Sequence, residues 1–89
     1  MAEAKVAEQR LTVKIFSPLK TYFYGQAQSL SAVNETGQFD ILPMHHNFIT
    51  LLSAGEISVK TLEGLVSTVA VSQSVLHAKD DDITIFVDV

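Results

Sequence analysis

Two adjacent histidines, His45 and His46, are the residues of this sequence best suited to bind a metal ion. A zinc site needs three or four ligands that converge on one point. Neighbouring residues of a strand point to opposite sides, so both imidazole rings can bind one ion only if the two histidines lie in a loop. His77 or a carboxylate would then have to supply the third ligand. These positions follow no recognisable metal-binding spacing, and no Gly-x-Ser-x-Gly elbow supports a serine nucleophile beside them. We therefore expect no metal site and no catalytic residues, and a structural or interface role for the histidines.

Three consecutive aspartates at residues 80–82 supply the oxygen ligands that calcium prefers, but they lack the spaced ligands and the glycine of a calcium loop. Aspartate tolerates turn geometry and discourages edge pairing, so a solvated hairpin tip explains them better. Tyr22, Phe23 and Tyr24 could stack on a base or a sugar, yet aromatic residues of strands are more often core or cross-strand partners. The four glycines are singly placed and form no phosphate-binding loop, so we expect no cofactor.

Composition limits the class of protein further. The chain has 89 residues, 47% of them hydrophobic, a formal net charge of −4 and no cysteine. This length favours one domain, and the absence of cysteine excludes disulfides and thiolate metal sites. An acidic balance argues against nucleic-acid binding, which needs a basic face. The apolar stretches are far shorter than a membrane span, and the charged N-terminus lacks the apolar region of a signal peptide.

The elements that must position these residues are predicted to be strands. Residues 1–10 show no repeating apolar face and are expected to form a mobile leader, whereas residues 11–89 form the domain. Beyond residue 10, β-branched and aromatic residues dominate, and turn signals recur at intervals of about 8–12 residues. The expected strands are residues 11–15, 22–24, 26–33, 39–42, 48–52, 57–61, 65–71, 75–78 and 83–89.

Short strands of this kind must stack face to face to bury their apolar sides. We therefore predict an all-β fold, a flattened β-sandwich of about eight to ten short, mostly antiparallel strands.

One segment carries a family signature. Residues 37–55, GQFDILPMHHNFITLLSAG, resemble the signature of the epsilon subunit of rotary F-type ATP synthases, in its N-terminal β-sandwich domain. The likeness extends to nearly everything after residue 10, including the first strand and the Phe23-Tyr24-Gly25 turn.

Several positions depart from the family pattern. Asp40 and Met44 stand where the family usually has glycine, so we expect the backbone there to avoid the positive φ angles that glycine permits. Gln73 and Ser74 replace a Gly-Gly pair, and Gln38 replaces a common glutamate. The sequence ends at Val89, before the C-terminal helical hairpin that is typical of the family. We therefore carry over none of the inhibitory and nucleotide-sensing behaviour attributed to that hairpin.

The resemblance implies a non-catalytic part of the central rotor stalk, which links the gamma subunit to the ring of c subunits and transmits torque. It would lie peripherally at the cytoplasmic face of the inner (plasma) membrane, held there through the complex and driven by a proton or sodium gradient. By position in the family pattern, gamma would be contacted by Ser17, His45 and Thr50. The c ring would be contacted by Glu35, Gln38 and Asp40.

The apolar residues around this segment are better explained as core, with one or two exposed for gamma: Phe39, Ile41, Phe48, Ile49, Leu51 and Leu52. Two other functions stay open. A stand-alone β-sandwich that binds a ligand or a protein would display Tyr22 and Tyr24 as one exposed cluster. A histidine-based metallohydrolase would hold stoichiometric zinc.

Overall fold

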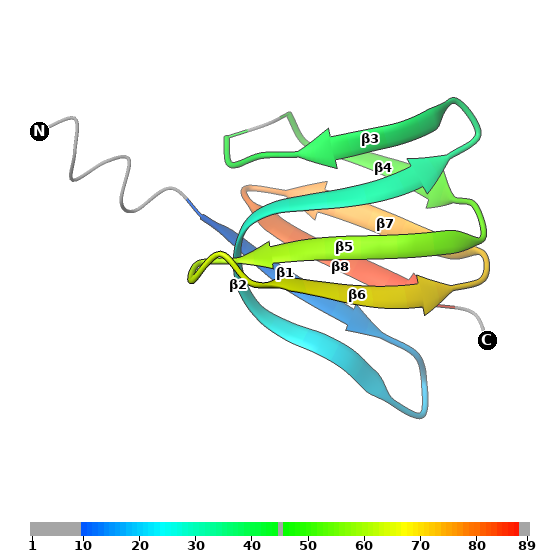
Figure 1. Cartoon of the computed structure of the whole chain (residues 1–89). Coiled ribbons are helices and arrows are strands. Elements are labelled where there is room, and N and C mark those ends of the chain that lie inside the picture. The colour runs from blue at the N-terminus through cyan, green and yellow to red at the C-terminus, as the bar shows by residue number, and fades with distance from the viewer. Residues whose placement is uncertain (1–9, 45, 88–89) are drawn as a thin grey trace, which may run out of the picture.

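The computed structural model describes residues 10–44 and 46–87, and these residues form eight strands and no helix (Figure 1). No helix that is long and apolar enough to cross a membrane occurs in this part of the chain. The strands are β1 (Leu11–Phe16), β2 (Thr21–Asn34), β3 (Gly37–Ile41), β4 (Phe48–Leu52), β5 (Gly55–Thr61), β6 (Val66–Val71), β7 (Ser74–Lys79) and β8 (Asp82–Val87). The predicted all-β architecture is confirmed.

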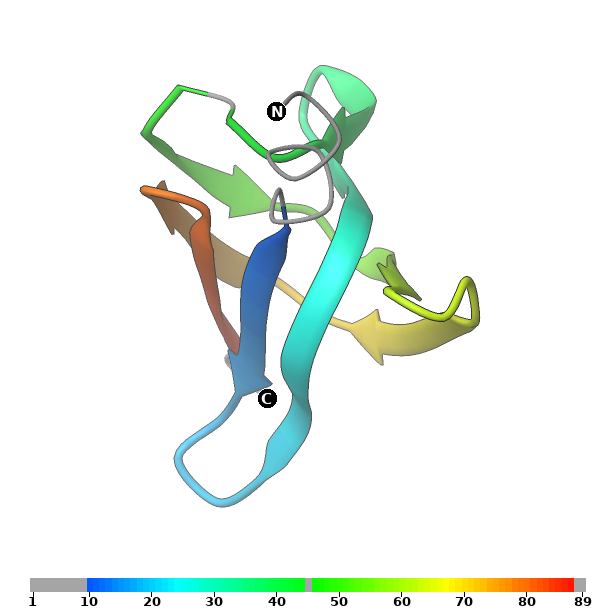
Figure 2. The ribbon, with the colours of Figure 1, turned by 90° about the vertical axis from the view of Figure 1, so that its left-hand side faces the viewer.

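The strands form one hydrogen-bonded sheet that folds over on itself into two layers. Its order is β4-β7-β8-β1-β2-β5-β6, and β3 also pairs with β2. β1 and β8 run in parallel, and the other strand pairs among the described residues are antiparallel. Viewed from the side, β7, β8 and β1 form one layer and β5 and β6 lie in the other, with the long β2 between them (Figure 2). β2 belongs to both layers.

Two of the predicted strands, residues 22–24 and 26–33, are one strand in the structure. Gly25 was expected to end the first of them, but it pairs with Val13 inside the β1–β2 ladder. An added Cβ at Gly25 would lie 3.7 Å from the Phe23 ring, an ordinary contact distance, so the space around this position does not require glycine. Pairing with β1 on one side keeps the strand extended through the glycine, because ladder hydrogen bonds outweigh the weak strand preference of this residue.

A bulge at Gln28 lets β2 pass from one layer to the other. Ala27 and Leu30 are both buried, although strict alternation would place them on opposite sides. The pairing with β5 shifts register between Ala27 and Ser29, and the Gln28 amide reaches outward to donate to the Leu62 carbonyl at 3.0 Å. An extra residue in one strand reverses the side to which later side chains point.

The core lies between the two layers and consists of aliphatic side chains. Every second residue of β1, β7 and β8 is buried, as their alternating sequences predict. The residues below 3% exposure are Leu11, Val13, Ile15, Ala27, Leu30, Ala32, Ile41, Leu52, Ile57, Val59, Leu76, Ala78, Ile83, Ile85 and Val87. Such a close-packed interior transmits strain with little deformation.

The loop between β3 and β4 differs from the sequence-based expectation. Met44 has a φ of 69°, so a methionine adopts the left-handed conformation that was expected to need glycine. The Met44 backbone N–H donates to the Asp81 carboxylate at 2.7 Å, and this bond favours the conformation despite its steric cost. The predicted leader lies outside the described residues except for Arg10, whose guanidinium donates to the Gln26 side chain at 3.1 Å.

Candidate protein-interaction surface

A row of apolar side chains crosses the outer face of the layer that contains β4, β7, β8 and β1. The sheet register places Leu51 beside Val75, Val75 beside Phe86, and Phe86 beside Phe16. We call these four residues the apolar row. Leu51, Val75 and Phe86 are 68%, 40% and 38% exposed, and the Phe16 and Phe86 rings meet edge to face at 5.4 Å.

The residues that flank the apolar row are mixed in character. Two residues further along the strands, on the same face, the register brings together Ile49, His77, Thr84, Lys14 and Tyr24. The Lys14 ammonium lies 4.9 Å from the centre of the Phe16 ring and 6.0 Å from that of Tyr24. The cation covers one end of the row, while Ile49 extends the apolar surface at the other end.

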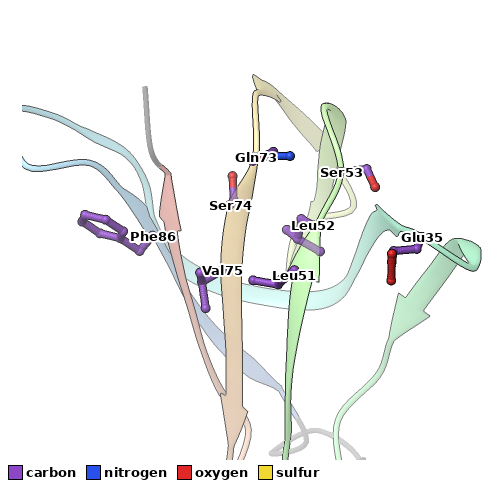
Figure 3. A pocket seen from close by; sticks show the side chains of 8 residues that line it. All are labelled: Glu35, Leu51, Leu52, Ser53, Gln73, Ser74, Val75 and Phe86. Atoms are coloured by element: carbon purple, nitrogen blue, oxygen red, sulfur yellow. The ribbon is translucent and has the colours of Figure 1, made fainter.

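A shallow depression of about 610 Å³ opens at the β4 end of the apolar row (Figure 3). Val75 and Leu51 lie in its middle, Phe86 on one side and the Glu35 carboxylate on the other. The remaining lining residues are Leu52, Ser53, Gln73 and Ser74. An apolar floor with one carboxylate at its rim suits an apolar side chain of a partner protein that has a basic residue nearby.

The outer face of the second layer is different. There the register aligns Asp40 of β3, Ser31 of β2, Ser58 of β5 and Thr68 of β6, which we call the polar row. The Ser31 hydroxyl donates to the Asp40 carboxylate at 2.6 Å. Hydroxyl and carboxylate groups at these positions are compatible with contact with water.

Two of the three residues predicted to contact gamma are sequence neighbours of the apolar row. Ser17 directly follows Phe16 and begins a tight turn, in which the Lys20 carbonyl accepts from its backbone N–H at 2.7 Å. Thr50 directly precedes Leu51, but its side chain points inward and its hydroxyl accepts from the Asn34 amide at 3.4 Å. His45 lies outside the described residues.

The residues predicted to contact the c ring fall in two places. Gln38 and Asp40 are exposed and point outward from β3, two residues apart. Glu35 occupies the two-residue turn between β2 and β3, which the Asn34 carboxamide closes by accepting from the Thr36 N–H at 2.9 Å. Glu35 and Leu51 line the same depression, so the structure places Glu35 at the edge of the apolar row.

The two alternative functions depend on Tyr22 with Tyr24 and on the histidines. Tyr24 is exposed on the outer face, whereas Tyr22 packs against the core, so the two do not form one exposed cluster. His77 lies on β7 and His46 in the β3–β4 loop. Among the residues that the structure describes, no three or more His, Cys, Asp or Glu side chains are arranged to hold a metal ion.

Sequence reasoning identified part of this surface and missed the rest. Ile49 and Leu51 are exposed, in agreement with one or two apolar residues of this segment serving a partner. Val75 and Phe86 were not singled out. The available signal was their position in alternating strands, where both are out of phase with the buried residues.

A β-sandwich with an apolar row on one outer face and a polar row on the other has the features of a protein-interaction domain. The chain matches over residues 10–89 the family described as ATP synthase, Delta/Epsilon chain, beta-sandwich domain. The chain therefore belongs to this family, as the sequence resemblance implied.

Similar proteins agree with this assignment. The chain is 29% identical over 80 residues to the ATP synthase epsilon chain of Geotalea daltonii, and 35% identical over 74 residues to that of Xanthomonas euvesicatoria. These matches include 90% and 83% of this chain, but only 57% and 53% of the relatives. The chain thus spans a little over half the length of these relatives.

Solved structures share the fold at low sequence identity. A chain of the Euglena gracilis mitochondrial ATP synthase, in a structure of its OSCP, F1 and c-ring parts, superposes with a TM-score of 0.82 at 14% identity. A chain of the central stalk and c ring of the Tetrahymena thermophila enzyme gives 0.72 at 13% identity. The matches cover 89% of this chain in both cases, and 51% and 63% of the respective neighbours.

Proposed function

We propose that this chain is a non-catalytic component of the central rotor stalk of an ATP synthase, where it links the gamma subunit to the c ring. The apolar row is the observation that carries the proposal. Exposure of four adjacent apolar side chains to water is unfavourable, and patches of this kind mark contacts with other proteins.

The gamma-binding surface is the apolar row together with the residues at its two ends. Ser17 follows one end and Thr50 precedes the other, so both predicted contact positions border the same surface. Because the Thr50 side chain points inward, its role is to fix β4 through the bond from Asn34, while Leu51 makes the contact. His45 remains a predicted gamma contact.

The ring-facing surface is the outer side of β3 with the neighbouring turn. Gln38 and Asp40 point to the same side, whereas Glu35, the third predicted ring contact, lies in the turn at the rim of the depression that borders the apolar row. Exposed charges at the rim of an interface influence association rate and register more than affinity. The two surfaces therefore differ in chemistry, one apolar for gamma and one acidic for polar or basic ring loops.

Torque passes between the two surfaces through the packed core. β2 belongs to both layers, so a force applied at the outer side of β1 reaches β3 through one continuous strand. Within this assembly the chain would lie peripherally at the cytoplasmic face of the inner (plasma) membrane.

The test measures the affinity of the chain for the purified gamma subunit of the same organism. Leu51→Asp places a charge in the apolar row, and we expect an affinity at least about 100-fold lower, since burying an unpaired charge costs several kcal/mol. Thr68→Asp adds the same charge to the polar row and is the matched control. We expect it to bind as the unaltered chain does. Thermal unfolding of both variants verifies that they fold.

The ring-facing surface is tested on the complex of the chain with gamma and the c ring. Gln38→Lys with Asp40→Lys should slow ring association several-fold and leave gamma affinity unchanged.

Two outcomes of the gamma-binding test would contradict the proposal. One is an equal loss of gamma affinity in Leu51→Asp and Thr68→Asp, and the other is no gamma binding by the unaltered chain.

A further inference from the structure

Two hydrogen bonds tie the loop between β3 and β4 to the tip of the β7–β8 hairpin. The Met44 N–H donates to Asp81 Oδ1 at 2.7 Å, and the Asp80 N–H donates to Asn47 Oδ1 at 2.9 Å. Each bond pairs a backbone group of one segment with a side chain of the other, although 37 and 33 residues separate the partners in sequence. The loop is thus held at both ends by a hairpin tip that was expected to be merely solvated.

The hairpin tip is itself firmly placed. Asp80 and Asp81 have φ angles of 52° and 66°, the left-handed pair required by a two-residue turn between Lys79 and Asp82. The Asp81 carbonyl also accepts from the Thr12 N–H of β1 at 2.9 Å. Because β1, β7 and β8 are core strands, the Asp81 carboxylate is fixed to the rigid part of the molecule.

Met44 shows why this bond is needed. Its left-handed conformation is sterically strained for a residue with a Cβ atom. Its side chain is 71% exposed and that of Leu42 59%, so burial of these two side chains contributes little to holding the loop. Polar contacts with the hairpin tip offset the strain.

The geometry points to Asp81 and Asn47 as positioning residues that hold the described parts of the loop, residues 42–44 and 46–47, in the conformation that meets the partner. This inference rests on the proposed function and extends its gamma-binding surface to the loop, where Leu42 and Met44 present exposed apolar side chains and from which β4 leads to Leu51. A loop fixed before binding loses less conformational entropy on association, so its anchors raise affinity without touching the partner. Asp81 acts on the Met44 end of the loop, and Asn47 on the end that enters β4.

Three variants of the tip test this role. Asp81→Ala removes the acceptor of the Met44 bond. Asp80→Ala is the matched control, because it replaces another aspartate at positive φ and keeps the backbone donor that reaches Asn47. Asp81→Asn keeps an acceptor oxygen and tolerates the left-handed conformation, so it is the conservative rescue. Asn47→Ala tests the second anchor.

Two measurements are made on each full-length variant, amide hydrogen exchange at Met44 and affinity for purified gamma. Asp81→Ala should raise the exchange rate at Met44 about tenfold and weaken gamma binding about five- to tenfold. Asp81→Asn should restore both to within about twofold of the unaltered chain. Asn47→Ala should weaken gamma binding several-fold without unfolding the chain. Asp80→Ala should match the unaltered chain in both measurements, whatever its loss of thermal stability.

Unchanged exchange in Asp81→Ala would overturn the anchoring. Faster exchange with unchanged gamma affinity, or equal losses in Asp80→Ala and Asp81→Ala, would overturn the positioning role while the proposed function stands. Failure of the unaltered chain to bind gamma would instead remove the proposed function, and the positioning role with it. If Asp81→Ala does not fold, Asn47→Ala and Asp80→Ala decide the outcome by the same criteria.

Discussion

Two rows of residues on the outer faces of this sandwich follow the same strand alternation yet carry opposite chemistry. The apolar row presents Leu51, Val75, Phe86 and Phe16, whereas the polar row presents Asp40, Ser31, Ser58 and Thr68. Both rows consist of residues out of phase with the core. The fold therefore tolerates polar residues at such positions, and the apolar ones need another reason.

We propose that this reason is contact with a partner protein. Single apolar residues on a surface are ordinary, but a row in register across four strands forms a continuous patch. The depression at its β4 end gives the patch a shape that a partner side chain can fill. The polar row presents hydroxyl and carboxylate groups and is suited to remain in water or to meet polar loops.

Truncation of a core residue should produce the largest effect, a loss of stability that does not involve either outer face. Leu30 is fully buried on β2, the strand shared by both layers, and Leu30→Ala should lower the free energy of unfolding by about 2–5 kcal/mol. Leu51→Ala, in the apolar row, should change it by less than about 0.5 kcal/mol. Urea denaturation measures both values. Equal losses would show that Leu51 serves the fold and not a partner.

Truncation within the apolar row should affect binding next most strongly. Phe86→Ala should weaken gamma affinity by about 2 kcal/mol, or roughly 30-fold, because aromatic anchors at the centre of an interface carry much of its energy. It should also lose the contact with Phe16, worth about 0.5–1.5 kcal/mol of stability. Thr68→Ala, in the polar row, is the control. Calorimetric titration with gamma separates the two variants, and similar affinities for both would contradict the assignment of the faces.

A reciprocal exchange of valine and threonine sharpens the comparison with the smallest change of shape. Val75→Thr should reduce gamma affinity about fivefold, since its hydroxyl loses water on binding at a cost of about 1 kcal/mol. Thr68→Val should leave gamma affinity unchanged. Both residues are β-branched and suit strands, so each variant should unfold within about 0.5 kcal/mol of the unaltered chain. Weaker binding by Thr68→Val would place gamma on the other face.

Strand content and core were predictable because they depend on local alternation. β1, β7 and β8 follow a strict period of two, and their buried residues are those that the pattern indicates. β2 was divided wrongly at Gly25, since local preference could not show that β1 would pair across it. Its bulge at Gln28 was equally hidden, because a change of layer depends on the partners of each half.

The candidate surface was predictable only in outline. The family signature around residues 37–55 indicated where to look, and the exposure of Ile49 and Leu51 agrees with it. Val75 and Phe86 joined the surface only once the order β4-β7-β8-β1 was known. The bond from Met44 to Asp81 connects segments that no sequence pattern relates.

By itself the sequence determined that this chain is an all-β domain of a known family, because side-chain alternation and turn residues act over a few positions. Only the tertiary structure decided which out-of-phase residues share a face, that one strand serves two layers, and that an aspartate at a hairpin tip holds a distant loop. These features depend on which strands pair, and pairing is settled by the burial of the whole core and not by any single segment.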